Sequence, residues 1–550
     1  MIYTEAFFAQ GSTFPNDDEV NLIDSYTFEP VIYKKTNVGV PAAGDGDGAV
    51  FRKKGNDFYK RQWTGYVNVL WWGIQGLSDQ LRTDRLNTIL QLGYDTFFGK
   101  MNIGISGVLF LQNNQRVLSD QCRIKQNKKN TEIFNCEEKK NISIKGFFLE
   151  GFKEDYDYAQ ASSSKAVGIY CYGTQNINIE KNLFKNFTYA GVSGLRNMVN
   201  LTFKQNRVEN EFTEDWAKIG TGKKDNAGIA VGGKNISVVQ NYFENSSQGM
   251  IIAENSKFVM ISDNDIENTI LEHGMYLDAG ISNMTVLGNR VRNTKGIGIK
   301  VQNYDQKKYP DYVCHNIVIS NNIVDNAGTI IDEALVATLD PLKDYIPAGG
   351  DGILINNTNE VAPYKLIASN VVVTGNVVRN AKQHGINIRH VEGGVISNNV
   401  INDIGNVGLY VSHAKGVDVS HNNIQTSREN GILIESNNNL LNVSFNIVEN
   451  PGIKNQGNEG RLAGIKLVEG NNYEIAIRHN KIRGNGMMTW GIFSEGGVGQ
   501  STHEIENNVV LNSKYIDYRF VNGTTKLRML RDNYKCILNS PGDTWLDPCL

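Results

Sequence analysis

Alternating apolar and polar positions run through the middle of the chain in short stretches that end at an asparagine. Examples are ISVVQNYFEN at 236–245, VVVTGNVVRN at 371–380 and LNVSFNIVEN at 441–450. A period of two predicts β-strands with one buried face. Aligning the first asparagine gives Asn182, Asn206, Asn241, Asn264, Asn289, Asn322, Asn376, Asn399, Asn422, Asn446, Asn480 and Asn508. Six of the eleven intervals are 23 to 25 residues long, so the basal repeat is about 23 residues.

A second strand pattern follows the asparagine blocks and begins with glycine, as in GMII (249–252), GMYL (274–277) and GINI (385–388). Two or three short strands in each repeat of about 23 residues are typical of a parallel β-helix. Its coils stack about 4.8 Å apart and share one continuous core. The handedness of parallel crossovers favours a right-handed coil. We therefore predict an all-β, right-handed parallel β-helix of about twelve or more coils, in which each recurrent asparagine bonds its equivalent in the next coil.

The segments outside the repeats predict the ends of this helix. Residues 77–93 suit an amphipathic α-helix that covers the N-terminal end, with Leu77, Leu81, Leu86, Ile89 and Leu90 on its apolar face. Residues 1–63 contain short strand patterns around AAGDGDG and predict a small N-terminal module. The β-helix is expected over 64–512, and 513–550 as a C-terminal cap or tail.

Composition narrows the class of partner. The chain contains 55 Gly and 10 Pro, and Gly and Asn suit tight turns. A net charge of −3 leaves no basic field for nucleic acid. The sequence has no apolar run of about 18 residues, so no membrane insertion is expected, and the start MIYTEAFFAQG does not have the pattern of a signal peptide.

The six cysteines do not have metal-ligand spacing. Cys122 with Cys136, and Cys536 with Cys549, could pair across short loops, but free thiols are the expected state. No metal and no cofactor are predicted.

Three stretches before the repeats carry a family resemblance: YVNVLWWGIQG (66–76), TDRLNTIL (83–90) and GISGVLFLQNNQRVLSDQ (104–121). Together with the coils they resemble the pectate-lyase-like superfamily and, within it, phage tailspike depolymerases. The resemblance covers about residues 45–512 and departs from the family pattern at GLSDQLR (76–82). It implies a homotrimeric virion protein, attached to a phage tail directly or through an adaptor protein, that binds and cuts a bacterial surface polysaccharide at the host surface.

The glycine-led strands also predict which side chains face outward, namely those two and four residues after the glycine. One predicted column holds Ala230, Ile251, Tyr276, Lys300, Leu354, Asn387, Tyr410, Leu433 and Lys466. The other holds Gly232, Ala253, Asp278, Gln302, Asn356, Arg389, Ser412 and Glu435. Since adjacent coils lie about 5 Å apart, Tyr276 and Asp278 should approach Lys300 and Gln302.

Glycoside cleavage needs a proton donor and a second carboxylate. Within NTILEHGMYLDAG (268–280) we predict Glu272 and Asp278 as this acid/base pair, with His273 assisting. Tyr276, Tyr410 and Trp216 would stack on sugars, and Lys300 and Arg389 would hold an acidic group. Asp351 and His384, at the position equivalent to His273, complete the predicted substrate-binding set. The insertions 209–227 and 303–351 would wall a groove, and Glu214, Asp215 and Asp225 in the first of them are rival carboxylates.

Alternative interpretations remain open. Charged residues on the outer face of a β-helix are expected simply because that face is solvated. The leading interpretation is an endo-acting depolymerase that hydrolyses its glycan. β-Elimination with His273, Lys300 or Tyr276 as base is the close alternative, and no Asp cluster of calcium-binding spacing is visible. A non-catalytic receptor-binding fibre and a bacterial carbohydrate-active enzyme outside any virion are the other two classes.

Overall fold

The computed structural model describes residues 2–10, 12–14, 17–37, 49–152, 165–213, 226–303, 313–328, 349–357, 368–453, 462–468, 472–495, 501–514, 516–521 and 525–531. They belong to two compact units, Met1–Thr188 and Tyr189–Leu550. The predicted boundaries at residues 63 and 512 stay predictions. Within the described part of the chain, no helix is long and apolar enough to cross a membrane.

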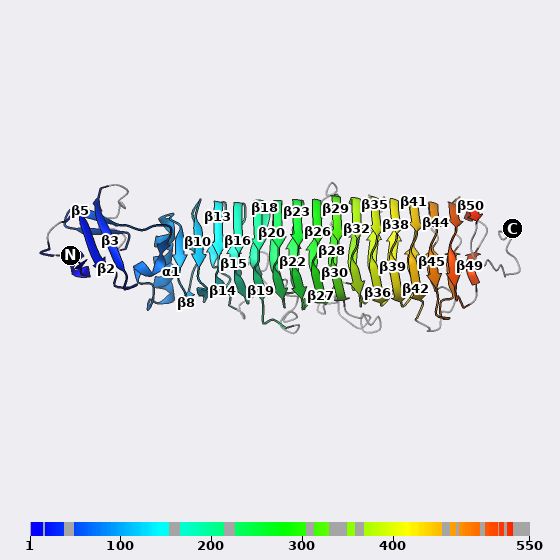
Figure 1. The fold of residues 1–550 in the computed structure, drawn as a ribbon, viewed down its shortest axis with the longest axis horizontal. Coiled ribbons are helices and arrows are strands. Elements are labelled where there is room, and N and C mark those ends of the chain that lie inside the picture. Colours follow the sequence, from blue (N-terminus) through cyan, green and yellow to red (C-terminus); the bar gives the residue numbers. More distant parts are fainter. Residues whose placement is uncertain are drawn as a thin grey trace. The chain divides into compact units, whose positions relative to one another are not determined.

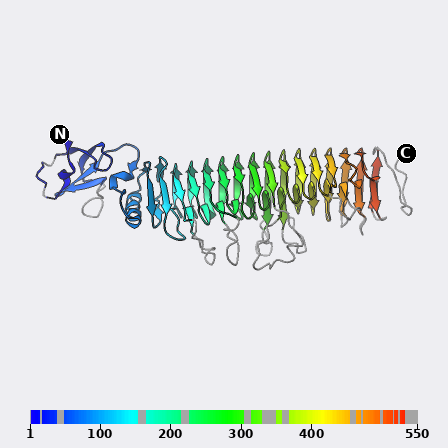
Figure 2. The ribbon, with the colours of Figure 1, turned by 90° about the horizontal axis from the view of Figure 1, so that it is seen from below.

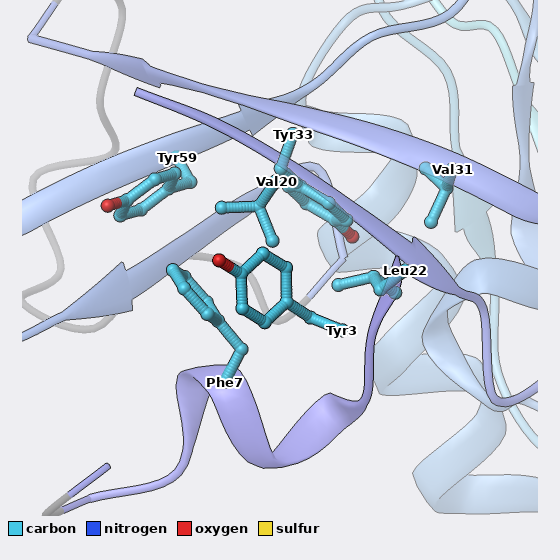
Figure 3. Close-up of a cluster of buried hydrophobic side chains, with 7 residues drawn as sticks. All are labelled: Tyr3, Phe7, Val20, Leu22, Val31, Tyr33 and Tyr59. Atoms are coloured by element: carbon cyan, nitrogen blue, oxygen red, sulfur yellow. The ribbon is translucent and has the colours of Figure 1, made fainter. Parts of the chain in front are cut away.

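A five-stranded sheet with the order β1-β2-β3-β5-β4 begins the first unit. Its strands are β1 (Ile2–Tyr3), β2 (Glu19–Ile23), β3 (Pro30–Thr36), β4 (Phe51–Lys54) and β5 (Asp57–Arg61). The alternation of buried and exposed residues in β2 and β3 directs one face of the sheet towards the 3-10 helix η1 (Glu5–Phe8). Figure 3 shows the resulting core, made by Tyr3, Phe7, Val20, Leu22, Val31, Tyr33 and Tyr59.

Helix α1 (Asp79–Gln91) lies where the sequence predicts a helix over 77–93. Its side chains bond the backbone of the strand region beside it. Asn87 Nδ2 donates to Val108 O at 2.8 Å, and Asn87 Oδ1 accepts from the N–H of Phe110 at 2.9 Å. These bonds occupy backbone groups that an open strand edge would expose. Leu81, which was expected on the apolar face, is instead exposed.

The remaining strands of the first unit are short and pair in parallel. They are β6 (Val67–Asn68), β7 (Thr96–Phe98), β8 (Asn102–Ile105), β9 (Leu109–Phe110), β10 (Arg116–Ser119), β11 (Arg123–Gln126), β12 (Phe134–Asn135), β13 (Lys140–Lys145), β14 (Phe148–Glu150), β15 (Val167–Tyr170), β16 (Gln175–Glu180) and β17 (Leu183–Lys185), with the 3-10 helix η2 (Val69–Trp72) after β6. Cys122, Cys136 and Cys171 are buried and free, and so is Cys314 of the second unit, which confirms the expected thiol state for the described cysteines.

The second unit stacks its strands in three rows, here called faces 1, 2 and 3, as Figures 1 and 2 show. Face 1 contains the glycine-led pattern: β22 (Gln248–Ile252), β25 (Met275–Leu277), β28 (Ile299–Asn303), β31 (Ile353–Asn357), β34 (Ile386–Arg389), β37 (Leu409–Ser412), β40 (Ile432–Ile434), β43 (Ala463–Leu467), β46 (Trp490–Glu495) and β49 (Ile516–Val521). The long strands β18 (Ala190–Lys204) and β20 (Ala227–Val239) contribute to faces 1 and 2.

Face 2 carries the alternating pattern: β23 (Lys257–Ser262), β26 (Ser282–Leu287), β29 (Cys314–Ser320), β32 (Ala368–Thr374), β35 (Val391–Ser397), β38 (Lys415–Ser420), β41 (Asn439–Ser444), β44 (Tyr473–Arg478), β47 (Ser501–Glu506) and β50 (Thr525–Arg531). Face 3 follows the asparagine: β19 (Arg207–Glu209), β21 (Tyr242–Glu244), β24 (Asp265–Glu267), β27 (Arg290–Thr294), β30 (Ile323–Ala327), β33 (Val377–Arg379), β36 (Val400–Ile404), β39 (Asn423–Ser427), β42 (Ile447–Pro451), β45 (Lys481–Arg483) and β48 (Val509–Leu511). All coil pairings are parallel, which confirms the predicted right-handed parallel β-helix.

A ladder of buried asparagine amides joins the coils between faces 2 and 3. From Asn206 to Asn508, each Nδ2 donates to Oδ1 of the next asparagine at 2.9–3.2 Å. The backbone N–H of each asparagine donates to the same Oδ1. The ladder thus satisfies polar groups that the turn buries, as the sequence predicts.

The glycines of face 1 have a different role from the one that composition suggests. A Cβ on Gly385 would lie 2.4 Å from Ile401 Cγ2 and 2.6 Å from Gly408 O, and the same two kinds of contact recur at Gly274, Gly352 and Gly431. The recurrent glycine therefore lets face 1 approach both the core of face 3 and the next coil. Asparagine, by contrast, supplies most of the non-glycine positive-φ positions in the turns.

Replacing one buried ladder asparagine should weaken the stack. In Asn376→Ala, the backbone and side-chain N–H groups of Asn322 lose their acceptor. Asn399 Oδ1 loses its side-chain donor and keeps only the backbone N–H of residue 376. Leaving buried polar groups unsatisfied predicts a loss of roughly 2–4 kcal/mol of unfolding free energy, measured by denaturant unfolding.

The control is Asn370→Gly, because Asn370 is exposed, bonds Asn316 at 3.0 Å and has φ of 54°, which glycine tolerates. It removes an amide-to-amide bond that faces water. Equal losses in the two variants would contradict the importance given to the buried ladder.

Gly385→Ala should also destabilise the second unit, by about 1–3 kcal/mol, since the new methyl overpacks the core and meets a backbone carbonyl. Gly99→Ala is the matched control, because its nearest contact would be an ordinary 3.7 Å to Leu70 Cδ1. Thermal unfolding of both variants measures the difference. A fully tolerated alanine at position 385 would show that face 1 does not need the glycine.

Candidate functional site

Face 1 brings the predicted outward residues into one row. Tyr276 pairs in register with Lys300, Lys300 with Leu354, Leu354 with Asn387, and Asn387 with Tyr410. The expectation that this face is solvated does not hold for most of the row, because Lys300, Leu354, Asn387 and Tyr410 are all less than 9% exposed. A row that points away from the core and yet is buried holds its polar groups in a weakly hydrated setting.

His273 connects two of these residues. Its ring stacks on Tyr276 with centroids 5.8 Å apart, and its Nε2 lies 3.2 Å from Lys300 Nζ. Its Nδ1 accepts the N–H of Ile297 at 3.1 Å, so the neutral ring carries its proton on Nε2. The contact joins the amine of Lys300 to the imidazole of His273.

Glu272 lies at the N-terminal end of β25. Its Oε2 accepts from Gln248 Nε2 at 2.6 Å, and both side chains are buried. Gln248 Oε1 has no hydrogen-bond partner among the described residues, although it is buried. An unsatisfied buried amide oxygen is uncommon, and one beside a carboxylate on this row suggests a polar group for a ligand.

Asp278 lies at the opposite end of β25, half-buried. The pKa of its carboxyl is raised to about 6, mainly by burial and in addition by the charge of Glu254 on the preceding coil, whereas the N–H of Ala279 and an ionised Lys300 oppose the shift. Ala279 N donates to Asp278 Oδ1 at 2.7 Å. A carboxyl with a raised pKa can donate a proton near neutral pH.

Asp351 and His384 occupy the position equivalent to His273 on later coils, as predicted. Backbone bonds from Gly298 to Asp351 and from Gly352 to His384 place them in one column. Asp351 Oδ1 accepts the N–H of His384 at 2.9 Å, and its Oδ2 accepts from Asn387 Nδ2 at 3.1 Å. Burial lowers the pKa of His384 despite the charge of Asp351. His384 Nδ1 lacks a hydrogen-bond partner among the described residues.

Tyr410 forms the far end of this cluster. Its ring stacks on His384 at 5.0 Å, and the guanidinium of Arg389 lies 4.6 Å from the ring centroid. Arg389 Nε donates to Asn387 Oδ1 at 3.1 Å, and the Tyr410 hydroxyl donates to Glu435. The arrangement presents an aromatic face beside a cation.

The structure thus brings most of the predicted residues onto one surface. Glu272, His273, Tyr276 and Lys300 form one group, and Asp351, His384, Asn387, Arg389 and Tyr410 form the next, with the Leu354 side chain between them. Asp278 lies at the end of the first group. Trp216, Glu214, Asp215 and Asp225 lie outside the described residues, as do the side chains of Gln302 and Asn356.

Sequence reasoning missed Glu254, Gln248 and Arg196. Glu254 acts on Asp278, and Arg196 Nη2 donates to Glu254 Oε1 at 2.9 Å. Gln248 precedes Gly249 in the same way that His273 precedes Gly274, so its position could have been found from the aligned glycines. Glu254 lies in a turn and Arg196 in an irregular part of β18, so the repeat gave no signal for them.

Among the residues that the structure describes, no three His, Cys, Asp or Glu side chains gather in a group that could hold a metal ion.

Comparisons with known proteins concern the fold. A family model described as a right handed β-helix region matches residues 167–361 and 351–527. Bacteriophage phi29 gene product 12 in its pre-mature form shares 14% identity over 82% of this chain and 57% of its own, with a TM-score of 0.54. Bacteriophage CBA120 tailspike protein 3 shares 11% identity over 88% of this chain and 65% of its own (TM-score 0.45).

The A-module of the Azotobacter vinelandii mannuronan C-5 epimerase AlgE6 shares 13% identity over 86% of this chain and 100% of its own, with a TM-score of 0.36. A search of curated proteins gives no match. At 14% identity and a TM-score of 0.54, gene product 12 shows a common fold and leaves the activity to be argued from the site.

Asp278 should make stability depend on pH. Its native pKa of about 6 lies above the unfolded value near 4, so the native state binds more protons between these limits. Its contribution is therefore most favourable below about pH 4 and declines as the pH rises through 6. Asp278→Asn should raise the unfolding free energy by up to about 2 kcal/mol above pH 7. It should also reduce the change of the unfolding free energy between about pH 4 and 6.

Denaturant unfolding of both proteins from pH 4 to 8 measures the effect. Glu392→Gln is the control, since Glu392 is an exposed carboxylate paired with Lys415 at 3.0 Å and such pairs contribute little. A wild-type profile that Asp278→Asn leaves unchanged would show that Asp278 titrates normally.

Proposed function

The chain belongs to the right-handed β-helix family, and on this basis we propose that it binds and cleaves a bacterial surface polysaccharide along face 1. The single observation that carries the proposal is Asp278, a half-buried carboxyl with its pKa raised to about 6, at the end of a row of aromatic, imidazole and cationic side chains. Face 1 offers a ring face for a sugar at the partly exposed Tyr276, with the Lys300 amine beside it, and the buried ring of Tyr410 lies beside the guanidinium of Arg389.

The chain's resemblance to tailspikes supports the finer part of this proposal. We propose a homotrimer on a phage tail, attached directly or through an adaptor protein, that meets its glycan at the host surface. Tailspike proteins are among the solved structures with the same fold. The chemistry proposed for face 1 follows from its own side chains and does not depend on attachment to a phage tail.

If the reaction is hydrolysis, Asp278 is the proposed proton donor. The carboxylic acid gives its proton to the glycosidic oxygen as the bond to the anomeric carbon breaks, and a second carboxylate activates water or attacks the carbon. Glu272 is the partner predicted from the sequence, with His273 assisting. It lies six residues before Asp278, on the other side of β25, and the three residues of β25 alone span roughly 10 Å.

Glu254 is the second candidate for the partner carboxylate. Its charge acts on Asp278, and Arg196 Nη2 lies 2.9 Å from its Oε1. An ionised carboxylate beside one that retains its proton is the combination that acid/base cleavage uses. Glu254 therefore joins Glu272 in the proposal, and the two assignments make different predictions.

β-Elimination is the alternative that a specific observation favours. Lys300 Nζ lies 3.2 Å from His273 Nε2, and in its neutral form this amine could take the C5 proton of a uronic acid. The C4–O4 bond would then break with formation of a C4–C5 double bond, and Asp278 would protonate the departing oxygen. Tyr276, whose ring centroid lies 5.5 Å from Lys300 Nζ, would border the same sugar.

The test is incubation with a panel of purified capsular polysaccharides, followed by mass analysis of the products. Hydrolysis adds one water for each cut and creates a reducing end, whereas elimination adds none and creates an unsaturated sugar that absorbs in the ultraviolet. Asp278→Asn should lower kcat by about 10²–10⁴-fold with either chemistry. Lys300→Met should abolish elimination but act mainly on KM if the enzyme hydrolyses.

The partner carboxylate is identified by comparing Glu254→Gln with Glu272→Gln, since only the true partner should show a kcat loss comparable with that of Asp278→Asn. Glu392→Gln should leave turnover unchanged. Binding without any cut would support a receptor-binding fibre, and full activity in Asp278→Asn would reject the proposed site.

A further inference from the structure

A second concave region lies beside Asp278, on the first coils of the second unit. It is an open pocket of about 570 Å³ lined by the backbone and side chains of residues 196–199, 233–234, 254–255 and Lys257. The backbone N–H of Asn255 in its wall donates to Ala279 O at 2.7 Å, directly after Asp278 in sequence. The pocket and the proposed proton donor are therefore neighbours.

The pocket arises from an irregularity in β18. Gly194 pairs with Val231, but the next pair is Met198 with Gly233, so β18 has extra residues opposite β20. Arg196 lies in this bulge, and so does Asn197, whose φ of 61° turns the chain. Bulges often redirect side chains next to binding sites.

The charges in the pocket do not balance. Arg196, Lys234 and Lys257 carry three positive charges against the one negative charge of Glu254, in a chain whose net charge is −3. Lys234 and Lys257 are partners in register on adjacent strands, which places like charges side by side. Within the described part of the chain neither lysine makes an ion pair, and the charged contact of Lys234 is with the Phe258 ring at 5.8 Å.

An exposed aromatic ring borders these cations. Phe258 is 51% exposed and lies next to Lys257 in sequence. A phenyl face suits the C–H face of a sugar ring, and two ammonium groups suit an anionic substituent on it. Together they describe a subsite for an acidic sugar rather than for an inorganic anion alone.

We propose that this pocket binds a carboxylate-bearing sugar of the polysaccharide, held by Lys234 and Lys257 against Phe258. The proposal rests on the function proposed above and deepens it, because it assigns the substrate to the acidic polysaccharides. The next sugar along the chain would then reach Asp278. Arg196 remains with Glu254, so the two lysines alone carry the recognition.

The test uses uronic-acid-containing capsular polysaccharide fragments and the same fragments after chemical reduction of their carboxyls to alcohols. Binding is measured in the Asp278→Asn background, which prevents turnover, and in the wild type in parallel. Carboxyl reduction should weaken binding about tenfold or more. The Lys234→Gln/Lys257→Gln variant should bind both forms with the same weak affinity and with a reduced dependence on salt.

The matched control is Lys415→Gln/Arg379→Gln, which removes the same charge from exposed positions on faces 2 and 3. It should keep the preference for the carboxylated fragments. Equal binding of native and reduced fragments, or a Lys234→Gln/Lys257→Gln variant that behaves like the control, would overturn the pocket assignment. Cleavage of the glycan with both variants unaffected would overturn this inference alone, whereas the absence of any glycan binding would overturn the proposed function with it.

Discussion

The buried asparagine ladder is the interaction on which the second unit depends. A coil of about 23 residues cannot bury its own apolar face, so it has to stack, and stacking buries the polar groups of every turn. The side-chain amide of each ladder asparagine bonds these groups, because it accepts and donates hydrogen bonds along the stack. Because the amide bonds only its direct neighbour, it also determines the register, and a slip of one residue would lose the bond and reverse each strand's faces.

The register between paired strands brings residues that are far apart in sequence together in one site. Tyr276 and Tyr410 are more than a hundred residues apart, yet they belong to one row of paired strands. Insertions between coils lengthen loops without disturbing the rows, since the ladder re-establishes the pairing after each one. The Asn322–Asn376 bond spans 54 residues and keeps the same 3.0 Å geometry as its neighbours. Variation in the polar side chains of face 1 therefore leaves the scaffold intact.

The repeat made the fold, the rows and the asparagine ladder predictable, because each follows from a period that the sequence displays directly. It did not reveal why glycine recurs on face 1, since the close contacts of Gly385 with Ile401 and Gly408 arise only when neighbouring coils stack. It also misjudged the exposure of Lys300 and Asn387, because burial depends on what surrounds a side chain as well as on its direction. The role of Glu254 could not be predicted from the repeat, since this residue belongs to an irregular turn.

Several side chains on face 1 and beside it destabilise the folded protein. Other coils have leucine or asparagine at the position equivalent to 300, yet a lysine is buried there against His273. Asp278 is held where its ionised form costs free energy, and Lys234 faces Lys257 across paired strands. Three such conflicts within neighbouring coils are better explained by a ligand that relieves them than by the needs of the fold.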